Sequence, residues 1–236
     1  TQAPVDRAKA QAIFDKLVGE KQSKGYVASE DGTPYQHSDK VVSGLLPQLL
    51  NPIGEDELAV LLADPHWTLQ EKFDGKRMML RVGETGVEAI NKLGLVVGVA
   101  APIAAAAAAL PAGTVLDGEV VGERFWAFDL LADGGADLTA QPYRQRHAAL
   151  VALLYGADPT LTAVGSWHDP QDKADQLAAL RERNAEGAVF KHLQAPYTAG
   201  RPASGGPQRK FKFVATASVR VAAVNGKRSV AVELLD

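Results

Sequence analysis

Short strand-like segments joined by tight turns constrain the fold of this chain more than any other feature of its sequence. After Pro65 the pattern of residues changes to that of strands, over Trp67–Phe73, Met78–Val82 and Gly86–Ile90. The Gly-Glu-Thr-Gly turn between the last two segments is too short for a crossover connection and joins antiparallel strands. The sequence therefore predicts antiparallel pairing in this part of the chain.

Helical segments are interspersed with the strands. One of them begins with Asp169 as N-cap and Pro170 at the first helical position. The predicted helices cover residues 7–18, 45–50, 56–62, 102–110, 142–155 and 170–183, and the remaining predicted strands cover 114–121, 124–130, 187–193, 210–214 and 218–224. Antiparallel strand pairs mixed with helices are typical of the α+β class. We therefore predict an α+β fold of antiparallel sheets flanked by helices.

Composition excludes several classes of protein. Hydrophobic residues make up 46% and charged residues 22% of the 236 residues, which is the balance of a globular protein. No apolar run approaches 18 residues, so we expect no transmembrane helix and no membrane partner. The absence of cysteine excludes a disulfide framework, a thiolate zinc site and a cysteine nucleophile. Because the N-terminus also lacks the features of a signal peptide, we expect a reducing, cytoplasmic setting.

Charge is distributed unevenly along the chain. The net charge is −3, which by itself gives no reason to expect a nucleic-acid partner. From Arg201 to Arg228, however, there are seven basic residues and no acidic one. This stretch is either a solvated basic face or a surface for a polyanion.

A lysine at the end of a predicted strand is the first candidate for chemistry. Residues 71–77 read Glu-Lys-Phe-Asp-Gly-Lys-Arg, so that Lys72 ends a strand, a tight Asp-Gly turn follows, and Arg77 comes next. The sheet would hold the backbone of Lys72 in place, and its ammonium group would point into the space that the following turn borders. The alternative is an ordinary hairpin turn with solvated charges.

Four further elements follow in a fixed order. They are Leu116–Val121, Phe125–Leu131, Glu186–Lys191 and Lys210–Lys212. In this order the chain resembles the covalent nucleotidyltransferases, the superfamily of ATP-dependent DNA and RNA ligases and mRNA capping enzymes. The resemblance runs from about Trp67 to Val214 and implies an ATP-grasp-like adenylation domain that uses ATP with Mg²⁺ or Mn²⁺.

The lysines of these elements fit phosphate chemistry. A lysine attacks phosphorus only as the neutral amine, and its ordinary pKa of about 10.4 makes that form scarce at pH 7. Neighbouring cations would lower this pKa and also neutralise phosphate oxygens. The resemblance implies that Lys72 is the nucleophile that forms lysyl-AMP. It also implies that Lys191, Lys210 and Lys212 contact the α-phosphate and supply the general acid.

Other residues of the same elements match contacts to the nucleoside and the metal. The resemblance implies that Arg77 contacts the ribose or the nucleic-acid end and that Phe128 stacks on the purine. It places Glu119 near the ribose hydroxyls and the metal, and Glu186 at the metal. Carboxylates are the ligands that Mg²⁺ prefers, together with water and phosphate oxygens. Taken without the resemblance, Phe128 would be an ordinary core residue.

Two positions depart from the pattern of the superfamily. Many DNA ligases have Glu two residues before the nucleophile to bind the adenine amino group, whereas this chain has Gln70 there and Glu71 next to Lys72. An amide can still make one polar contact with adenine, so ATP remains favoured. An Arg is usual before the Gly of the next element, and Lys92 takes its place, which keeps the charge and loses the planar fork.

The resemblance also predicts a division of the chain into three parts. Residues 1–40 are an appendage, 41–214 the adenylation domain, and 215–236 two strands joined at Asn225-Gly226, like the opening hairpin of an OB-type barrel. Two strands cannot close a barrel, so we expect either that the chain is truncated or that something else completes the site. The chain alone should form lysyl-AMP slowly. Phe14–Val27 resembles the end of a WGR domain, although the Trp-Gly-Arg signature is absent. The alternative is a helix and loop packed on the catalytic core.

These residues predict an ATP-dependent polynucleotide ligase. It would transfer AMP from Lys72 to a 5′-phosphate, which a 3′-hydroxyl then attacks to seal a nick or break. We expect a monomer and favour DNA over RNA as the substrate. The alternatives are an RNA ligase, a capping-type guanylyltransferase that uses GTP, and a catalytically weak protein that binds nucleic-acid ends.

Overall fold

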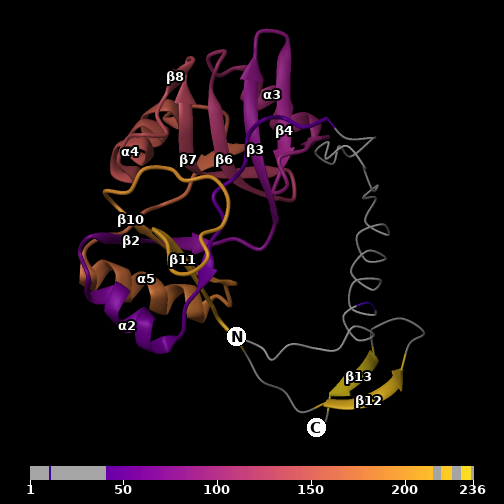
Figure 1. Ribbon diagram of the computed structural model, residues 1–236, viewed down its shortest axis with the longest axis vertical. Coiled ribbons are helices and arrows are strands. Elements are labelled where there is room, and N and C mark those ends of the chain that lie inside the picture. Colours follow the sequence, from indigo (N-terminus) through magenta and orange to yellow (C-terminus); the bar gives the residue numbers. More distant parts are fainter. Residues whose placement is uncertain (1–10, 12–40, 215–218, 225–229, 235–236) are drawn as a thin grey trace. The chain divides into compact units, whose positions relative to one another are not determined.

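The computed structural model describes Gln11 and residues 41–214, 219–224 and 230–234 (Figure 1). The chain divides into two compact units, residues 1–44 and 45–236, and the fold described below is that of the second. The helix predicted over residues 7–18 and the segment that resembles a WGR domain lie outside the described residues. No helix among the described residues has the length and apolar character needed to cross a membrane.

The described residues form four helices and thirteen strands. Figure 1 labels most of them. The helices are α2 (Glu55–Ala63), α3 (Ala101–Ala108), α4 (Tyr143–Leu154) and α5 (Pro170–Glu182), and the strands are β1 (Asn51–Pro52), β2 (Trp67–Lys72), β3 (Lys76–Gly83), β4 (Gly86–Asn91), β5 (Val96–Val97), β6 (Val115–Val121), β7 (Arg124–Asp133), β8 (Ala136–Asp137), β9 (Leu161–Ala163), β10 (Gly187–His192), β11 (Gln208–Lys212), β12 (Val219–Val224) and β13 (Val230–Leu234).

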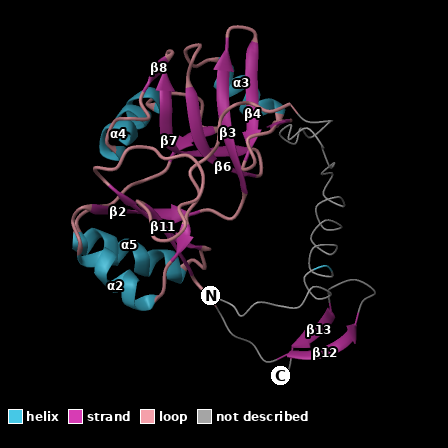
Figure 2. Cartoon of the chain, viewed as in Figure 1, coloured by secondary structure: helices cyan, strands magenta, loops and turns pink. Residues whose placement is uncertain are grey.

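Two sheets make up the framework of the second unit. The smaller has the strand order β1-β11-β10-β2, and the larger has the order β5-β4-β3-β6-β7-β8, with β9 paired to β7. Apart from the parallel pairs β1–β11 and β7–β9, the strands of both sheets pair antiparallel. Helices α2 and α5 lie side by side against the smaller sheet (Figure 2). The predicted α+β fold of antiparallel sheets flanked by helices is confirmed.

Each sheet has its own hydrophobic core. Under the smaller sheet, Leu69 of β2 and Phe190 of β10 pack against Leu58 of α2 and Leu180 of α5. Under the larger sheet, buried residues of β3, β6 and β7 pack against α3 and α4, with Ile103 and Leu150 fully inaccessible. A third cluster, with Met79, Ile90 and Leu131 buried, lies on the other face of the larger sheet.

Two polar side chains fix the N-terminal part of α5. The Asp169 carboxylate caps α5, accepting hydrogen bonds from the backbone N–H groups of Gln171 and Asp172, as the sequence predicts. One turn later, the fully buried Lys173 ammonium donates to the carbonyls of Leu61, Asp64 and Trp67 at 2.6–3.0 Å. Burial lowers the pKa of Lys173. Sequence analysis did not single out this lysine, because its acceptors are backbone groups that only the fold supplies.

The helix predicted over Leu45–Leu50 is wrong. This segment is extended, and Gln48 makes a parallel bridge to Gly200. The backbone N–H of Leu49 donates to the Gly200 carbonyl at 2.8 Å, and Asn51–Pro52 continues as β1 beside β11. Tertiary hydrogen bonds to the β10–β11 loop thus override a local helical pattern. The other strands that the sequence missed, β5, β8 and β9, are each two or three residues long.

The chain passes from the smaller sheet to the larger in three residues. β2 ends at Lys72 and β3 begins at Lys76, so Phe73, Asp74 and Gly75 form the connection. A Cβ atom on Gly75 would lie 2.3 Å from the Val120 carbonyl oxygen. Glycine is therefore required where this connection packs against β6.

The predicted C-terminal hairpin is present as β12 and β13, an antiparallel pair with a register shift between Val221 and Ala223. Its expected turn at Asn225-Gly226 lies outside the described residues.

We predict that Phe190→Ala destabilises the second unit strongly. Phe190 is fully inaccessible in the core of the smaller sheet, so truncation leaves a cavity and should lower the free energy of unfolding by about 3–5 kcal/mol. Urea unfolding measures this change. The control Val60→Ala, on the exposed face of α2, should change it by less than about 0.5 kcal/mol. Equal effects of the two substitutions would contradict the packing described.

Candidate active site

A cavity of about 550 Å³ lies between the two sheets. β2, β10 and β11 of the smaller sheet and β3, β6 and β7 of the larger contribute to its lining. Nine of the residues singled out from the sequence line it: Gln70, Glu71, Lys72, Arg77, Lys92, Glu119, Phe128, Lys191 and Lys210. The structure thus brings together Lys92 and residues from all five sequence elements.

The two remaining candidates, Glu186 and Lys212, do not line the cavity but are linked to Lys72, which does. The Lys72 ammonium pairs with Oε2 of Glu186, and the Lys212 ammonium pairs with Oε1 of the same carboxylate at 2.7 Å. Burial alone would raise the pKa of Glu186, but the hydrogen bonds from Lys212 and Lys72 outweigh it and lower that pKa. The hydrogen bond between Lys212 and Glu186 also raises the pKa of the exposed Lys212.

Strand register explains why these three side chains meet. Gly187 lies opposite Lys72 of β2 on one side and opposite Lys212 of β11 on the other. Its φ of +154° and the 2.0 Å that would separate a Cβ atom from the Phe211 carbonyl oxygen both require glycine. The strand can therefore approach both neighbours closely directly after Glu186.

Glu119 is a second carboxylate at the cavity. Burial raises its pKa, although Arg77 and Lys72 act in the opposite direction. Its carboxylate makes no hydrogen bond or ion pair with the part of the chain that the structure describes, and the negative charge of Glu186 also reaches it. Among the described residues no group of three or more His, Cys, Asp or Glu could hold a metal ion. A metal at Glu119 and Glu186 would therefore need further oxygen ligands from water or phosphate.

Arg77 is held by the protein more firmly than the sequence indicated. Its guanidinium makes two hydrogen bonds to Asp117, at 2.8 and 2.7 Å, and a third to the Gln48 carbonyl at 3.1 Å. The Tyr197 hydroxyl donates to the same carboxylate at 3.1 Å. Burial would lower the pKa of Arg77, but the charge of Asp117 outweighs it. Contact of Arg77 with a ribose or a nucleic-acid end stays a prediction.

Two cations lie over the ring of Phe128. The Arg77 Cζ atom is 4.4 Å from the ring centroid and the Lys191 Nζ atom is 4.6 Å from it. Lys191 also lies 4.5 Å from the Tyr143 ring centroid and donates to the Phe128 carbonyl at 2.9 Å. Burial lowers the pKa of Lys191 to about 7. Stacking of a purine on Phe128 and binding of phosphate by Lys191 both stay predictions.

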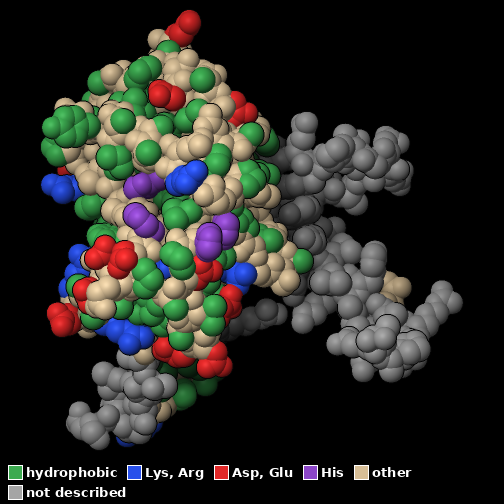
Figure 3. Space-filling model, turned by 90° about the vertical axis from the view of Figure 1, so that its left-hand side faces the viewer, with side chains coloured by type: hydrophobic (Ala, Val, Ile, Leu, Met, Phe, Trp, Pro, Cys, Tyr) green, Lys and Arg blue, Asp and Glu red, His purple; other side chains and the backbone are tan. Residues whose placement is uncertain are grey.

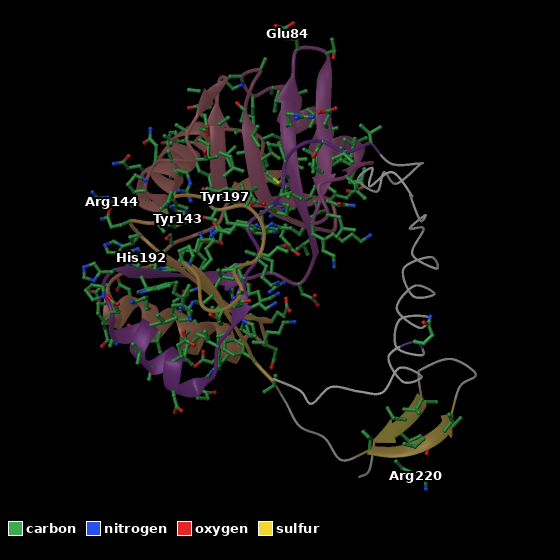
Figure 4. The ribbon with its side chains drawn as sticks, viewed as in Figure 1. Glu84, Tyr143, Arg144, His192, Tyr197 and Arg220 are labelled. Carbon is green, nitrogen blue, oxygen red and sulfur yellow. The ribbon has the colours of Figure 1, made fainter. Side chains whose placement is uncertain are left out.

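The aromatic residues around this cluster come from distant parts of the chain. Figure 4 labels Tyr143 of α4 and Tyr197 of the β10–β11 loop in the region where the two sheets meet. The buried Arg146 guanidinium lies over both rings and makes two hydrogen bonds to Asp129, at 2.8 and 2.9 Å. Sequence analysis missed Asp117, Tyr197 and this second ion pair, because no local pattern links residues so far apart.

Polar residues at the edge of the cavity have varied environments. Gln70 is buried, and its amide nitrogen has a long contact, 3.5 Å, to the Val164 carbonyl. Glu71 pairs with Arg183 at 2.6 Å, and the exposed Lys92 lies at the rim. Burial lowers the pKa of Lys210, and the charge of Arg201 adds to this effect. Arg201 itself lines the cavity, although the sequence placed it only in a basic stretch.

In the described part of the stretch Arg201–Arg228, several basic side chains are paired with acidic ones. Arg209 pairs with Glu57 and lies over the Trp67 ring, and Arg220 pairs with Glu233 at 2.5 Å. Lys227 and Arg228 lie outside the described residues. Figure 3 shows acidic and basic side chains intermingled over the lower part of one face, with histidines above them. Of the described basic residues in this stretch, only Arg201 and Lys210 line the cavity.

The chain is similar in sequence to DNA ligases. Over 109 residues it is 39% identical to a probable DNA ligase of Streptomyces griseus, a match that covers 43% of this chain and 21% of the relative. Over 137 residues it is 35% identical to a probable DNA ligase of Streptomyces avermitilis, covering 56% and 24%. It thus spans about a quarter or less of the length of these curated relatives. No family model matches the chain.

Solved structures give the fold. A mycobacterial DNA ligase D complexed with ATP and MES superposes with a TM-score of 0.62 at 23% identity, over 77% of this chain and 64% of that one. This chain has the fold of a DNA ligase nucleotidyltransferase domain. A Lig E DNA ligase, described as binding DNA with a minimal scaffold, matches with a TM-score of 0.58 at 19% identity, over 80% of each chain. The resemblance to ATP-dependent DNA ligases that the sequence elements indicated is confirmed.

We predict that Lys191 makes the stability of the domain depend on pH. Its folded-state pKa of about 7 lies below the ordinary 10.5, so the unfolded chain binds more protons between these values. The free energy of unfolding is therefore highest above the pKa that Lys191 has in the unfolded chain. It falls by at most about 1.4 kcal/mol per pH unit as the pH drops toward about 7. Urea unfolding of the wild type and Lys191→Met measures this. A difference between them that does not change from about pH 7 to 10 would contradict the prediction.

Proposed function

We propose that this chain is the catalytic part of an ATP-dependent DNA ligase that forms a lysyl-AMP intermediate and joins 5′-phosphate to 3′-hydroxyl ends. One observation carries the proposal. A lysine at a strand end, Lys72, borders a cavity that also holds an unpaired half-buried carboxylate, Glu119, and a further lysine, Lys210. The sequence similarity to DNA ligases and the fold support the same reaction.

The first step is attack of the Lys72 amine on the α-phosphorus of ATP. A nitrogen–phosphorus bond forms, the bond to the pyrophosphate oxygen breaks, and the ammonium loses a proton. Lys72 must leave Glu186 to react, and Lys212 holds the other oxygen of that carboxylate. Glu186 therefore keeps a cationic partner when Lys72 turns toward the nucleotide. Lys210 and Lys212 would neutralise phosphate oxygens and supply the general acid.

The later steps follow from the phosphoramidate. A 5′-phosphate oxygen displaces Lys72 from the AMP phosphorus, and a 3′-hydroxyl then attacks the activated 5′-phosphate and releases AMP. Phe128 would stack on the adenine, Gln70 and Glu71 would lie near the base, and Arg77, Lys92 and Lys191 would contact the nucleotide. Each of these residues lines the cavity, which supports their assignment.

The residues at the cavity fit a hard divalent cation. Glu119 and Glu186 would hold Mg²⁺ or Mn²⁺, because the Glu119 carboxylate has no partner in the described part of the protein and carboxylates suit such ions. The bound metal would offset charge on the phosphates.

We further propose DNA rather than RNA as the substrate, since the named relatives are DNA ligases. The protein would be a monomer that acts on nicks or breaks in the cytoplasm, as its lack of cysteine favours. Residues 1–40, 41–214 and 215–236 would be an appendage, the adenylation domain and the opening hairpin of an OB-type barrel. Among the alternatives, an RNA ligase shares every residue named above, so only the substrate separates it.

Lys72→Arg should abolish the covalent adduct. A guanidinium stays protonated and cannot attack phosphorus, whereas its size and charge otherwise match those of lysine. Incubation with α-labelled ATP and Mg²⁺, followed by mass spectrometry, should place AMP on Lys72 alone. The matched variant Lys76→Arg, from the same element, should keep the adduct. AMP found on Lys76 or Lys191 would refute the assignment, and labelling by GTP instead of ATP would favour a capping-type enzyme.

Sealing assays test the choice of substrate. A nicked DNA duplex carrying a preadenylylated 5′ end should be joined, since this substrate bypasses the first step. The matched nicked RNA duplex should be joined more slowly. Faster sealing of the RNA would favour the RNA ligase, and adduct formation without sealing of either would favour a protein that only binds ends.

A further inference from the structure

The three-residue connection between the sheets determines where Lys72 lies relative to the larger sheet. Lys72 is the last residue of β2 in the smaller sheet, whereas Glu119 and Phe128 belong to β6 and β7 of the larger. A displacement of the connection would therefore move the Lys72 amine relative to these residues. The contacts that hold the connection in place therefore also set where Lys72 lies relative to Glu119 and Phe128.

Two contacts hold the connection against the larger sheet. Gly75 lies so close to the Val120 carbonyl that no larger residue fits. At the other end, the Phe73 ring stacks on the Trp126 indole with 4.4 Å between ring centroids and 17° between ring planes. Phe73 directly follows Lys72, so this stack acts on the residue next to the proposed nucleophile.

Trp126 has a defined place in the larger sheet. It pairs with Glu119 across the β6–β7 ladder, and its neighbours Phe125 and Ala127 point into the fully buried core. Alternation along the strand puts the Trp126 side chain on the opposite face from these two, together with that of Glu119. Phe73 lines the cavity, whereas Trp126 does not. Trp126 therefore lies outside the cavity but contacts its lining through the ring of Phe73.

We propose that Trp126 is a positioning residue for Lys72, acting through the ring of Phe73. The stack joins the strand end that carries the nucleophile to the strand pair that carries Glu119. A stacked aromatic pair has a preferred geometry as well as an apolar contact area, so it restricts the connection more narrowly than an aliphatic contact would. This inference rests on the proposed lysyl-AMP chemistry.

The first test is the rate of lysyl-AMP formation. Trp126→Leu should lower the rate at saturating ATP about tenfold or more, because small misplacements of reacting groups are costly in rate. The ATP concentration for half-maximal rate should change less than about twofold, since Trp126 does not line the cavity. Trp126→Phe, which keeps a stacking ring, should restore most of the rate.

The matched control is Trp67→Leu. Trp67 lies at the other end of β2, where its ring contacts His192 edge-on at 5.3 Å between centroids. Its loss should change stability without the selective fall in rate at saturating ATP. The double variant Phe73→Leu/Trp126→Leu should be no slower than the slower single variant, because the two rings act as one unit.

A second readout does not depend on activity. Trace labelling with acetic anhydride, followed by mass spectrometry, reports the reactivity of each lysine. Trp126→Leu should change the labelling of Lys72 relative to Lys92 about threefold or more, since the environment of the Lys72 amine alters. Trp126→Phe should leave this ratio near that of the wild type.

The outcomes are distinguishable. If the wild-type chain forms no lysyl-AMP, the proposed function is wrong, while the labelling ratio still decides whether Trp126 positions Lys72. If Trp126→Leu keeps the wild-type rate and labelling ratio, or if Trp126→Phe is as impaired as Trp126→Leu, the positioning role is wrong. Equal impairment of Trp67→Leu would overturn it as well.

Discussion

The passage of the chain between two sheets directly after Lys72 is the constraint on which the site depends. Because β2 pairs with β10 in one sheet and β3 pairs with β6 in the other, only Phe73, Asp74 and Gly75 connect them. A connection this short leaves little freedom to either strand. It keeps the end of β2 close to β6, so the cavity lies beside Lys72.

Two buried ion pairs link the elements around this cavity, and one of their residues, Arg77, lines it. Arg77–Asp117 and Arg146–Asp129 each have two hydrogen bonds, and Tyr197 contacts both pairs, through its hydroxyl on Asp117 and its ring under Arg146. Buried pairs contribute little net stability relative to apolar residues, but removal of one partner typically costs about 3–5 kcal/mol. Their value here is geometric, since they hold β3, β6, β7, α4 and the β10–β11 loop in one arrangement.

The same arrangement gathers positive charge beside the cavity. The carboxylate of Glu186 receives Lys72 and Lys212 on separate oxygens, and Lys210 and Arg201 bring further positive charge. A polyphosphate offers several anionic oxygens and suits such a cluster. Glu119 opposes it as a carboxylate with no hydrogen bond or ion pair among the described residues. Clustered cations beside an unpaired carboxylate would suit a nucleotide bound with a divalent ion.

The sequence by itself determined the fold class, most element boundaries and which residues to suspect. Strand alternation, short turns and the Asp169 cap are local signals, and α5 and the β3–β4 hairpin lie where those signals put them. The order of the lysine and carboxylate elements identified Lys72, Glu119 and Glu186. Only the tertiary structure decided the extended course of Leu45–Leu50, the pairing of Arg77 with Asp117, and the burial of Lys191 between Phe128 and Tyr143. Those features depend on partners that lie far apart in the sequence, and no local propensity can specify them.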